Sequence, residues 1–142
     1  MKTLRQLLAS KNRSPVCVAP ADTVFNALKV MADNDVGAVL VLEQDRLVGI
    51  FSERDYARKG ILHGKASKDT LVREVMSDKV LYVTPDRSIE ECMAIMTDKH
   101  FRHLPILEDD KVIGIISIGD VVKETISAQQ FIIAQMEKYI TG

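Results

Sequence analysis

Two short segments of this sequence place a hydroxyl group and a carboxylate three residues apart. The segment GIFSERD carries Ser52 and Asp55, and the segment GIISIGD carries Ser117 and Asp120. In each segment an apolar run predicts a strand that ends at the serine, where a helix is predicted to begin. A serine and an aspartate at this spacing can cap the helix, because the serine oxygen accepts a hydrogen bond from an early backbone N–H and a carboxylate suits the positive end of the helix. The same geometry can hold a ligand, since the carboxylate can accept hydrogen bonds from two vicinal ribose hydroxyls while the serine and nearby N–H groups meet a phosphate.

The two segments belong to an internal repeat. With an offset of 65 residues, positions 16–56 align with positions 81–121 without a gap, and eleven of the 41 aligned positions are identical. Many other pairs exchange one apolar residue for another. This agreement predicts a duplicated structural unit. In the first copy the identical residues are Val18, Pro20, Met31, Asp33, Leu42, Glu43, Asp45, Gly49, Ile50, Ser52 and Asp55.

Each copy predicts the same order of elements, β-α-β-β-α. An extended stretch ends at a proline, and a helix follows, which Thr23 or Asp22 can cap in the first copy and a Ser88–Glu91 capping box in the second. Two apolar runs joined by a polar turn then predict a hairpin. One unit cannot bury its sheet alone, so we expect an α+β fold in which two repeats pack face to face with pseudo-twofold symmetry. The predicted parts are an N-terminal helix at 1–13, repeats at 14–63 and 79–126, a linker at 64–78 and a C-terminal helix at 127–142.

The composition is that of an ordinary globular protein. The chain has 142 residues, of which 46% are apolar, and a net charge of −1, which gives no whole-chain reason to expect nucleic acid. The longest mostly apolar run, at 36–42, is too short to cross a membrane, and the first residues contain no secretory signal, so we predict a cytoplasmic protein. Cys17 and Cys92 form no CxxC pair and are expected to be buried, and with three scattered histidines no metal site is predicted.

Two copies of Gly-apolar-apolar-Ser-x-x-Asp in register, each preceded by a helix and a hairpin, resemble a tandem pair of CBS domains (named after cystathionine β-synthase). The resemblance covers positions 16–124 and is closest to the stand-alone bacterial type of CBS-pair protein. It implies a regulatory module rather than an enzyme. Such pairs bind adenosine nucleotides, here NAD(H), AMP, ADP or ATP, in clefts between the repeats. They commonly form homodimers and regulate another protein, which is unidentified in this case.

The resemblance also implies roles for individual residues. In this family the aspartate holds ribose, which assigns that role to Asp55 and Asp120, and Ser52 and Ser117 are expected to contact phosphate. Adenine is held by the first strand and the hairpin of each repeat. Packing of the hydrophobic core explains most of these positions equally well, although the hydroxyl of Thr84 can reach a ligand. The positions that correspond to the adenine pocket are Val18, Ala19, Val39, Val83, Thr84 and Leu104.

Basic residues distinguish the two copies. The segment 54–68 contains five basic residues and one acidic residue. Arg54 and Arg58 lie four positions apart, which predicts that they share a helix face and can grip a phosphate in bidentate fashion. For Lys59, Lys65 and Lys68, an ordinary solvated surface is the simpler interpretation.

The second copy has Ile118 and Gly119 where the first has Glu53 and Arg54. It instead carries Arg102 and His103 directly before its hairpin, where basic residues contact phosphates in some nucleotide-binding CBS proteins. His103 can equally be an ordinary surface histidine. The unequal residues predict two sites with different phosphate preferences.

Three classes of function compete, namely a nucleotide sensor, a structural homodimer and an enzyme, and weak nucleic-acid binding is a further alternative. We predict that the Asp55 site, with Arg54 and Arg58, takes an adenine nucleotide with a diphosphate, such as NAD(H) or ADP. The alternatives are a structural homodimer without a physiological ligand and a weak nucleic-acid binder. The sequence supplies no nucleophile–base pair and no Walker-type loop, so no catalytic residues are predicted. The C-terminal helix places Ile132, Met136, Tyr139 and Ile140 on one side, which packs either on its own domain or on a second subunit.

Overall fold

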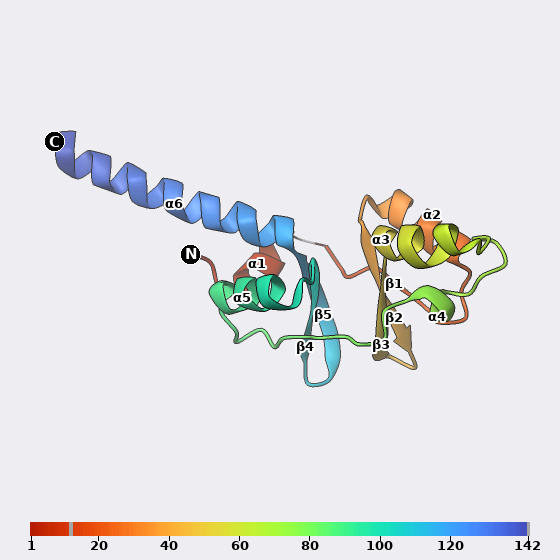
Figure 1. Cartoon of the computed structure of the whole chain (residues 1–142). Coiled ribbons are helices and arrows are strands. Elements are labelled where there is room, and N and C mark those ends of the chain that lie inside the picture. The colour runs from red at the N-terminus through yellow and green to blue at the C-terminus, as the bar shows by residue number, and fades with distance from the viewer. Residues whose placement is uncertain (12, 142) are drawn as a thin grey trace. The chain divides into compact units, whose positions relative to one another are not determined.

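The computed structural model describes residues 1–11 and 13–141 (Figure 1). The chain divides into two compact units, one formed by Ser14–Tyr82 with Leu107–Ile113 and the other by Met1–Arg13, Val83–Ile106 and Gly114–Gly142. Helices and strands alternate in each repeat, which confirms the predicted α+β class. The elements in chain order are α1 (Leu4–Lys11), β1 (Cys17–Val18), α2 (Val24–Asn34), β2 (Ala38–Glu43), β3 (Arg46–Ser52), α3 (Glu53–Asp55), the π-helix η1 (Tyr56–Gly60), the 3₁₀-helix η2 (Ile61–His63), α4 (Val72–Val75), α5 (Ile89–Lys99), β4 (His103–Glu108), β5 (Lys111–Ser117) and α6 (Ile118–Thr141).

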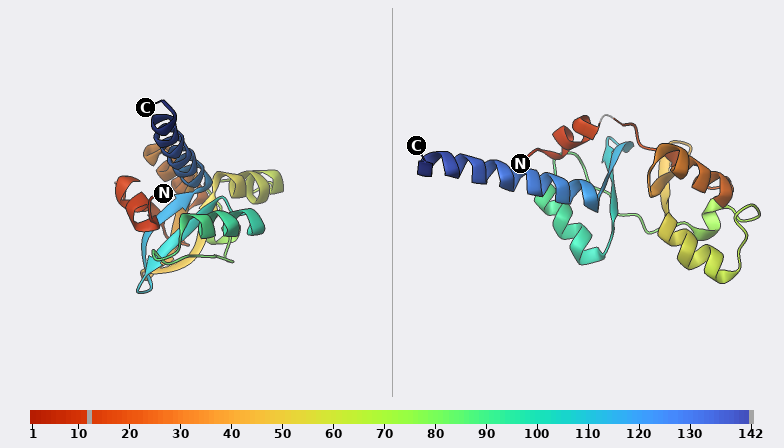
Figure 2. Two further views of the ribbon diagram at one scale, coloured as in Figure 1. Left: turned by 90° about the vertical axis from the view of Figure 1, so that its left-hand side faces the viewer. Right: turned by 90° about the horizontal axis from the view of Figure 1, so that it is seen from above.

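The first repeat is built on a three-stranded sheet in the order β1-β2-β3. Strand β1 runs parallel to β2, with Val18 opposite Val41, and β2 pairs with β3 in antiparallel fashion. Helices α2, α3 and α4 lie on one face of this sheet (Figures 1 and 2). The buried residues of the core follow the predicted helical and strand spacing. They are Val18, Val24, Ala27, Met31, Val39, Val41, Phe51, Val72 and Val75.

The second repeat reproduces this plan. Strands β4 and β5 pair, and Val83 forms a parallel bridge with Ile106, which corresponds to the Val18–Val41 pair at the offset of 65 residues. Helix α5 buries Ile89, Cys92 and Met96, the counterparts of the buried residues of α2. In Figure 2, α1, α5 and the first half of α6 gather on one side of the β4–β5 hairpin.

The helix caps and turns match between the repeats, residue by residue. Thr23 caps α2, its Oγ1 accepting from Asn26 N at 3.1 Å, and Ser88 and Glu91 form the predicted capping box of α5. Each hairpin turn has two successive residues with positive φ, as a type I′ turn requires. The two turns are Gln44–Asp45 (φ 51° and 65°) and Asp109–Asp110 (φ 53° and 64°).

Two helices that the sequence analysis leaves outside the repeats complete their cores. In one unit, α4 buries Val72 and Val75, and Ser77 after it exchanges two backbone hydrogen bonds with Ile50 of β3, at 3.0 and 2.9 Å. In the other unit, α1 buries Leu4 and Leu7. Each hairpin therefore has a covering helix that precedes the neighbouring repeat in the sequence.

A glycine in the last strand of each repeat allows this close approach. A Cβ on Gly49 would lie 2.6 Å from Met76 Sδ, and a Cβ on Gly114 would lie 2.5 Å from Leu8 Cδ2. Met76 follows α4 and Leu8 belongs to α1, so the two side chains occupy matching places. The identical glycines of the repeat are thus explained by the two covering helices.

The structure differs from the sequence predictions in three places. The second helix of the first repeat is not regular, because α3 passes into the π-helix η1, where the buried Gly60 leaves room for the ring of Tyr56. The predicted C-terminal helix is not a separate element, since α6 runs unbroken from Ile118 to Thr141. Cys17 is exposed rather than buried, because β1 turns only Val18 toward the core, whereas Cys92 is buried as predicted.

The apolar residues near the end of α6 are exposed to solvent. Ile132, Met136, Tyr139 and Ile140 are all exposed, so the helix does not bury them against its own unit. In Figure 1 the second half of α6 extends beyond α1 and α5. Within the described residues, no helix combines the length and apolar character that crossing a membrane requires.

Candidate functional site

The first Ser-x-x-Asp segment forms the start of α3. Ser52 is the N-cap, and its Oγ accepts from Asp55 N at 3.2 Å. The Asp55 carboxylate folds back, so that its Oδ2 accepts from Ser52 N and from Ser52 Oγ, both at 3.0 Å. Two hydrogen bonds therefore hold this carboxylate at the first helical turn, where the helix end is positive, and the bond from Asp55 N to Ser52 Oγ closes the cap.

The second segment forms the start of α6 in the same way. Ser117 Oγ accepts from Asp120 N at 3.1 Å, and Asp120 Oδ2 accepts from Ser117 N at 2.8 Å. Both aspartates are partly buried. The capping interpretation of the sequence is thus confirmed in both repeats, and it fixes each carboxylate in one orientation.

A backbone hydrogen bond ties each helix start to the beginning of the neighbouring strand. Glu53 N donates to Gly37 O at 3.1 Å, and Ile118 N donates to Arg102 O at 2.8 Å. In the second repeat this bond brings Arg102 and the adjacent His103 to the helix start that holds Asp120. The two basic residues and the Ser117–Asp120 cap are therefore neighbours in the structure, as the phosphate hypothesis requires.

The cations near Asp55 come from its own helical segment. Lys59 Nζ lies 3.7 Å from Asp55 Oδ1, and about half of the lysine side chain is exposed. Arg54 and Arg58 are both exposed, in α3 and η1 respectively. They project from consecutive turns next to the cap, and their contact with phosphate stays a prediction.

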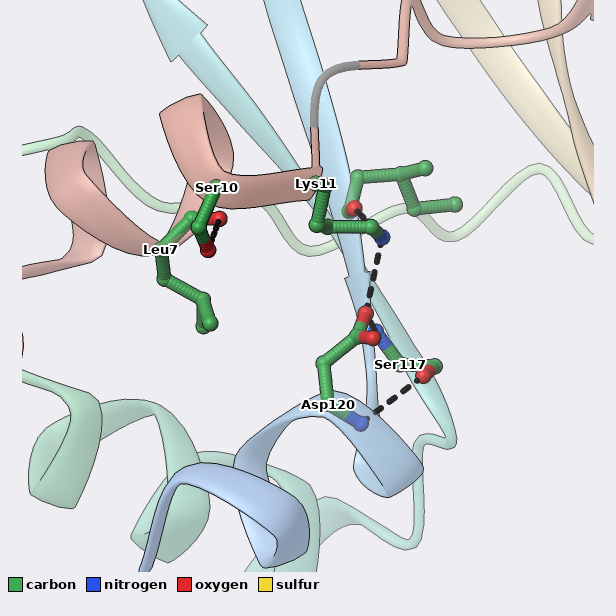
Figure 3. A network of polar contacts seen from close by, with 6 residues as sticks. Leu7, Ser10, Lys11, Ser117 and Asp120 are labelled. Atoms are coloured by element: carbon green, nitrogen blue, oxygen red, sulfur yellow. Dashed lines mark hydrogen bonds and ion pairs between the residues drawn. The ribbon is translucent and has the colours of Figure 1, made fainter. Parts of the chain in front are cut away.

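The cation at Asp120 comes from the other end of the sequence. Lys11, the last residue of α1, places its Nζ 2.8 Å from Asp120 Oδ2 and 2.8 Å from the carbonyl oxygen of Ile115 (Figure 3). Burial acts to raise the pKa of the Asp120 carboxyl, but the hydrogen bonds from Lys11 and Ser117 and the charge of Lys11 outweigh it, so that the pKa lies below its ordinary value. The sequence analysis missed Lys11, and the available signal was a lysine at the end of an amphipathic helix.

The residues assigned to the adenine pocket fall into two groups. Val18, Val39, Val83 and Leu104 are buried, as core packing predicts. Ala19 and Thr84 are exposed beside them, and the Thr84 hydroxyl donates to Asp86 Oδ1. A ligand can therefore reach Ala19 and Thr84 directly, and the adenine assignment of all six stays a prediction.

Among the residues that the structure describes, no cluster of side chains could hold a metal ion, and neither cysteine is an activated thiol. No group of three or more His, Cys, Asp or Glu among these residues could hold a metal ion. Partial desolvation by neighbouring atoms raises the pKa of the Cys17 thiol even though the residue is exposed, and burial together with the charge of Glu91 raises the pKa of Cys92 to about 11. Both cysteines are therefore thiols rather than nucleophilic thiolates at neutral pH.

Comparison with known proteins identifies the repeats. The family profile named CBS domain matches residues 6–61 and 72–127. The chain is 37% identical, over 99% of its length and 72% of the relative's, to the CBS domain-containing protein CBSX3, mitochondrial, from Arabidopsis thaliana. Both matched segments begin within the covering helices α1 and α4, in agreement with their structural role.

Solved structures give the same result. The chain superposes with a TM-score of 0.84 on the crystal structure of the CBS domain NE2398, at 48% identity, covering 88% of this chain and 98% of that one. A candidate signal-transduction protein with CBS domains from Burkholderia ambifaria MC40-6 gives a TM-score of 0.85 at 46% identity, covering 90% and 96%. Paired CBS domains act as regulatory or signal-transduction modules and are generally not enzymes. This chain, with its two matched repeats, belongs to the CBS-domain family.

Proposed function

We propose that this protein is a cytoplasmic regulatory module that binds adenosine nucleotides (NAD(H), AMP, ADP or ATP) at its two Ser-x-x-Asp helix starts and passes the signal to a partner. The observation that supports it is the matched pair of caps, each of which fixes a partly buried carboxylate at a first helical turn. CBS-domain proteins commonly bind adenine nucleotides, and the family resemblance assigns ribose binding to the aspartate of this motif.

The chemistry of the Asp55 site fits a nucleotide. A carboxylate can accept hydrogen bonds from both hydroxyls of a ribose, because its two oxygens offer about four acceptor positions. The N-terminal end of a helix attracts phosphate, and Arg54 and Arg58 add positive charge beside it. We therefore propose that this site takes an adenine nucleotide with a diphosphate, NAD(H) or ADP.

The test is calorimetric titration with ADP and NADH of the wild-type protein and of Asp55→Ala. We expect the variant to lose at least about tenfold in affinity, since it loses charge-assisted hydrogen bonds to the ribose. Asp33→Ala, which removes an exposed aspartate of α2 in the same unit, is the matched control and should bind as the wild type does. Equal binding by the wild type and Asp55→Ala contradicts the assignment.

A screen of thermal stability separates the proposal from its main rival, a structural homodimer without a physiological ligand. A ligand that binds the native state raises its apparent stability. An adenosine nucleotide should therefore raise the melting temperature of the wild-type protein more than that of Asp55→Ala. If AMP, ADP, ATP and NAD(H) all leave the melting temperature unchanged, the structural interpretation is preferred.

We also propose that α6 is the surface through which the protein forms a homodimer. Its exposed apolar residues recur at helical spacing along one side of a 24-residue helix, and a second copy offers an apolar side of the same length. These residues are Ile118, Val122, Ile126, Ile132, Ile133, Met136, Tyr139 and Ile140.

Light scattering after size-exclusion chromatography tests the homodimer. Ile133→Glu places a charge within the apolar side and should convert dimers to monomers, whereas Gln130→Glu, on the adjacent side of the same helix, should not. A wild-type monomer, or a dimer that Ile133→Glu leaves intact, contradicts the proposal and leaves α6 as a surface for the regulated protein.

A further inference from the structure

Lys11 is held in place by the packing of α1, not by the ion pair alone. Leu4 and Leu7 of this helix are buried, and Leu8 lies directly over Gly114 of β5, where a Cβ would be 2.5 Å from Leu8 Cδ2. Just before the helix, Lys2 N donates to Oε1 of the buried Glu124 at 3.0 Å. These contacts place Lys11, the last residue of α1, near the end of β5, where α6 begins.

The Lys11 ammonium group binds the acceptors that a ligand of Asp120 would meet. Its Nζ donates to Asp120 Oδ2 and to Ile115 O, both at 2.8 Å (Figure 3). Asp120 Oδ2 also accepts from Ser117 N, so this oxygen already carries two hydrogen bonds. Three quarters of each side chain in the pair is shielded from solvent, which strengthens the interaction relative to an exposed pair.

In the first repeat, the corresponding backbone group is paired with other backbone and not with a lysine. Ile50, the counterpart of Ile115, pairs its backbone with Ser77 instead. Lys59 Nζ lies 3.7 Å from Asp55 Oδ1 on the same helical segment, and the lysine side chain is about half exposed. A ribose can push this side chain into solvent without disturbing any other element.

We propose that Lys11 is an intramolecular competitor for the second nucleotide site. While Lys11 is bound, it lowers the affinity of the Asp120 carboxylate for a ribose, and a nucleotide that binds there displaces the ammonium group and loosens the C-terminal turn of α1. This inference rests on the proposed function, since it assumes that Asp120 holds ribose. It predicts that nucleotide fills the Asp55 site before the Asp120 site. It also predicts that the C-terminal turn of α1 changes its order when nucleotide occupies the second site.

The coupling must act in both directions. If nucleotide binding weakens the hold on Lys11, removal of the Lys11 ammonium must strengthen nucleotide binding by the same factor. A partly buried, charge-assisted pair of this kind corresponds to roughly fivefold in affinity.

Titration with ADP tests the proposal, in an Asp55→Asn background that leaves only the second site intact. Lys11→Met keeps the apolar stem of the side chain and removes the charge. We expect it to bind ADP roughly fivefold more tightly than the Asp55→Asn parent. The matched control is Lys59→Met in an Asp120→Asn background, which should change affinity for ADP at the first site by less than about twofold.

Hydrogen exchange provides a second readout that does not depend on affinity. ADP should increase the exchange of the amides of residues 8–11 in the Asp55→Asn parent, whereas in Lys11→Met these amides should exchange fast already without ADP. Unchanged or weaker binding by Lys11→Met overturns the proposal, and weaker binding would make Lys11 a ligand contact. If ADP binds none of the proteins, the wild type included, the proposed function fails together with this inference, whereas binding that is insensitive to Lys11 overturns the inference alone.

Discussion

The two helix starts of this protein are alike in their own residues and differ in what reaches them from elsewhere in the chain. Ser52 with Asp55 and Ser117 with Asp120 form equivalent caps within a few tenths of an ångström. Their surroundings diverge, because the first is covered by backbone from the segment after α4 and the second receives Lys11 from α1. A duplicated motif therefore guarantees a duplicated geometry but not a duplicated electrostatic environment.

The largest expected difference between the two repeats is in the loss of unfolding free energy when each strand glycine is replaced by alanine. Gly49→Ala should lower the free energy of unfolding by about 2–3 kcal/mol, because its Cβ would press on both Met76 and the backbone oxygen of Ser77, 3.0 Å away. Gly114→Ala should cost about 1 kcal/mol, since the three nearest atoms all belong to the flexible side chain of Leu8. Urea unfolding of both variants measures the difference. Equal losses, or a larger loss for Gly114→Ala, would show that the two covering helices are held in a different way.

The two serine caps should show a smaller contrast. Ser52→Ala should destabilise the protein by about 1 kcal/mol, the usual cost of losing an N-cap, because it also removes the hydroxyl that donates to Asp55. Ser117→Ala should cost about half as much, since Lys11 still holds the Asp120 carboxylate. Thermal or urea unfolding at neutral pH gives both values. A larger loss of unfolding free energy for Ser117→Ala than for Ser52→Ala would contradict this prediction.

The smallest expected effect is the pH dependence of the stability that the Lys11–Asp120 pair contributes. Because the pKa of Asp120 is lowered in the folded state, its contribution to stability is fully present above the ordinary value of 3.8 and is lost as the pH falls through the lowered pKa. The gap in unfolding free energy between the wild type and Lys11→Met, about 1 kcal/mol or less at neutral pH, should therefore close as the pH falls below 3.8 and through the lowered pKa. Unfolding curves of both proteins across this range measure it, with Lys59→Met as the control that should show little gap at any pH. A gap that stays constant in acid would mean that the Lys11 ammonium does not stabilise the Asp120 carboxylate.

Much of the repeat was predictable because its signals are local. The capping box of α5 and the Ser-x-x-Asp caps each depend on residues three apart in the sequence, and their hydrogen bonds form whenever the helix forms. The buried positions of α2 and α5 follow from helical spacing in the same way. The hairpins were predicted from their apolar runs, although the two-residue turns became evident only from the positive φ angles.

Other features escaped the sequence because their cause lies far along the chain or in backbone geometry. The irregular turn at Tyr56–Gly60 depends on how one ring fits against one glycine, which residue types do not specify. The exposure of Cys17 depends on which side of a two-residue strand faces the core. Alternation along so short a strand is no guide to its orientation.

By itself, the sequence determined that there are two repeats, where the helices of these repeats begin, and that a serine and a carboxylate meet at two of these beginnings. The tertiary structure decided which helix covers which hairpin, and so which charge reaches each carboxylate. The Lys11–Asp120 pair spans 109 positions, and nothing in either local segment encodes it. Hydrogen bonds between near neighbours are set by local backbone geometry, whereas contacts between distant segments depend on how buried surfaces pack, and that is settled only when the whole unit folds.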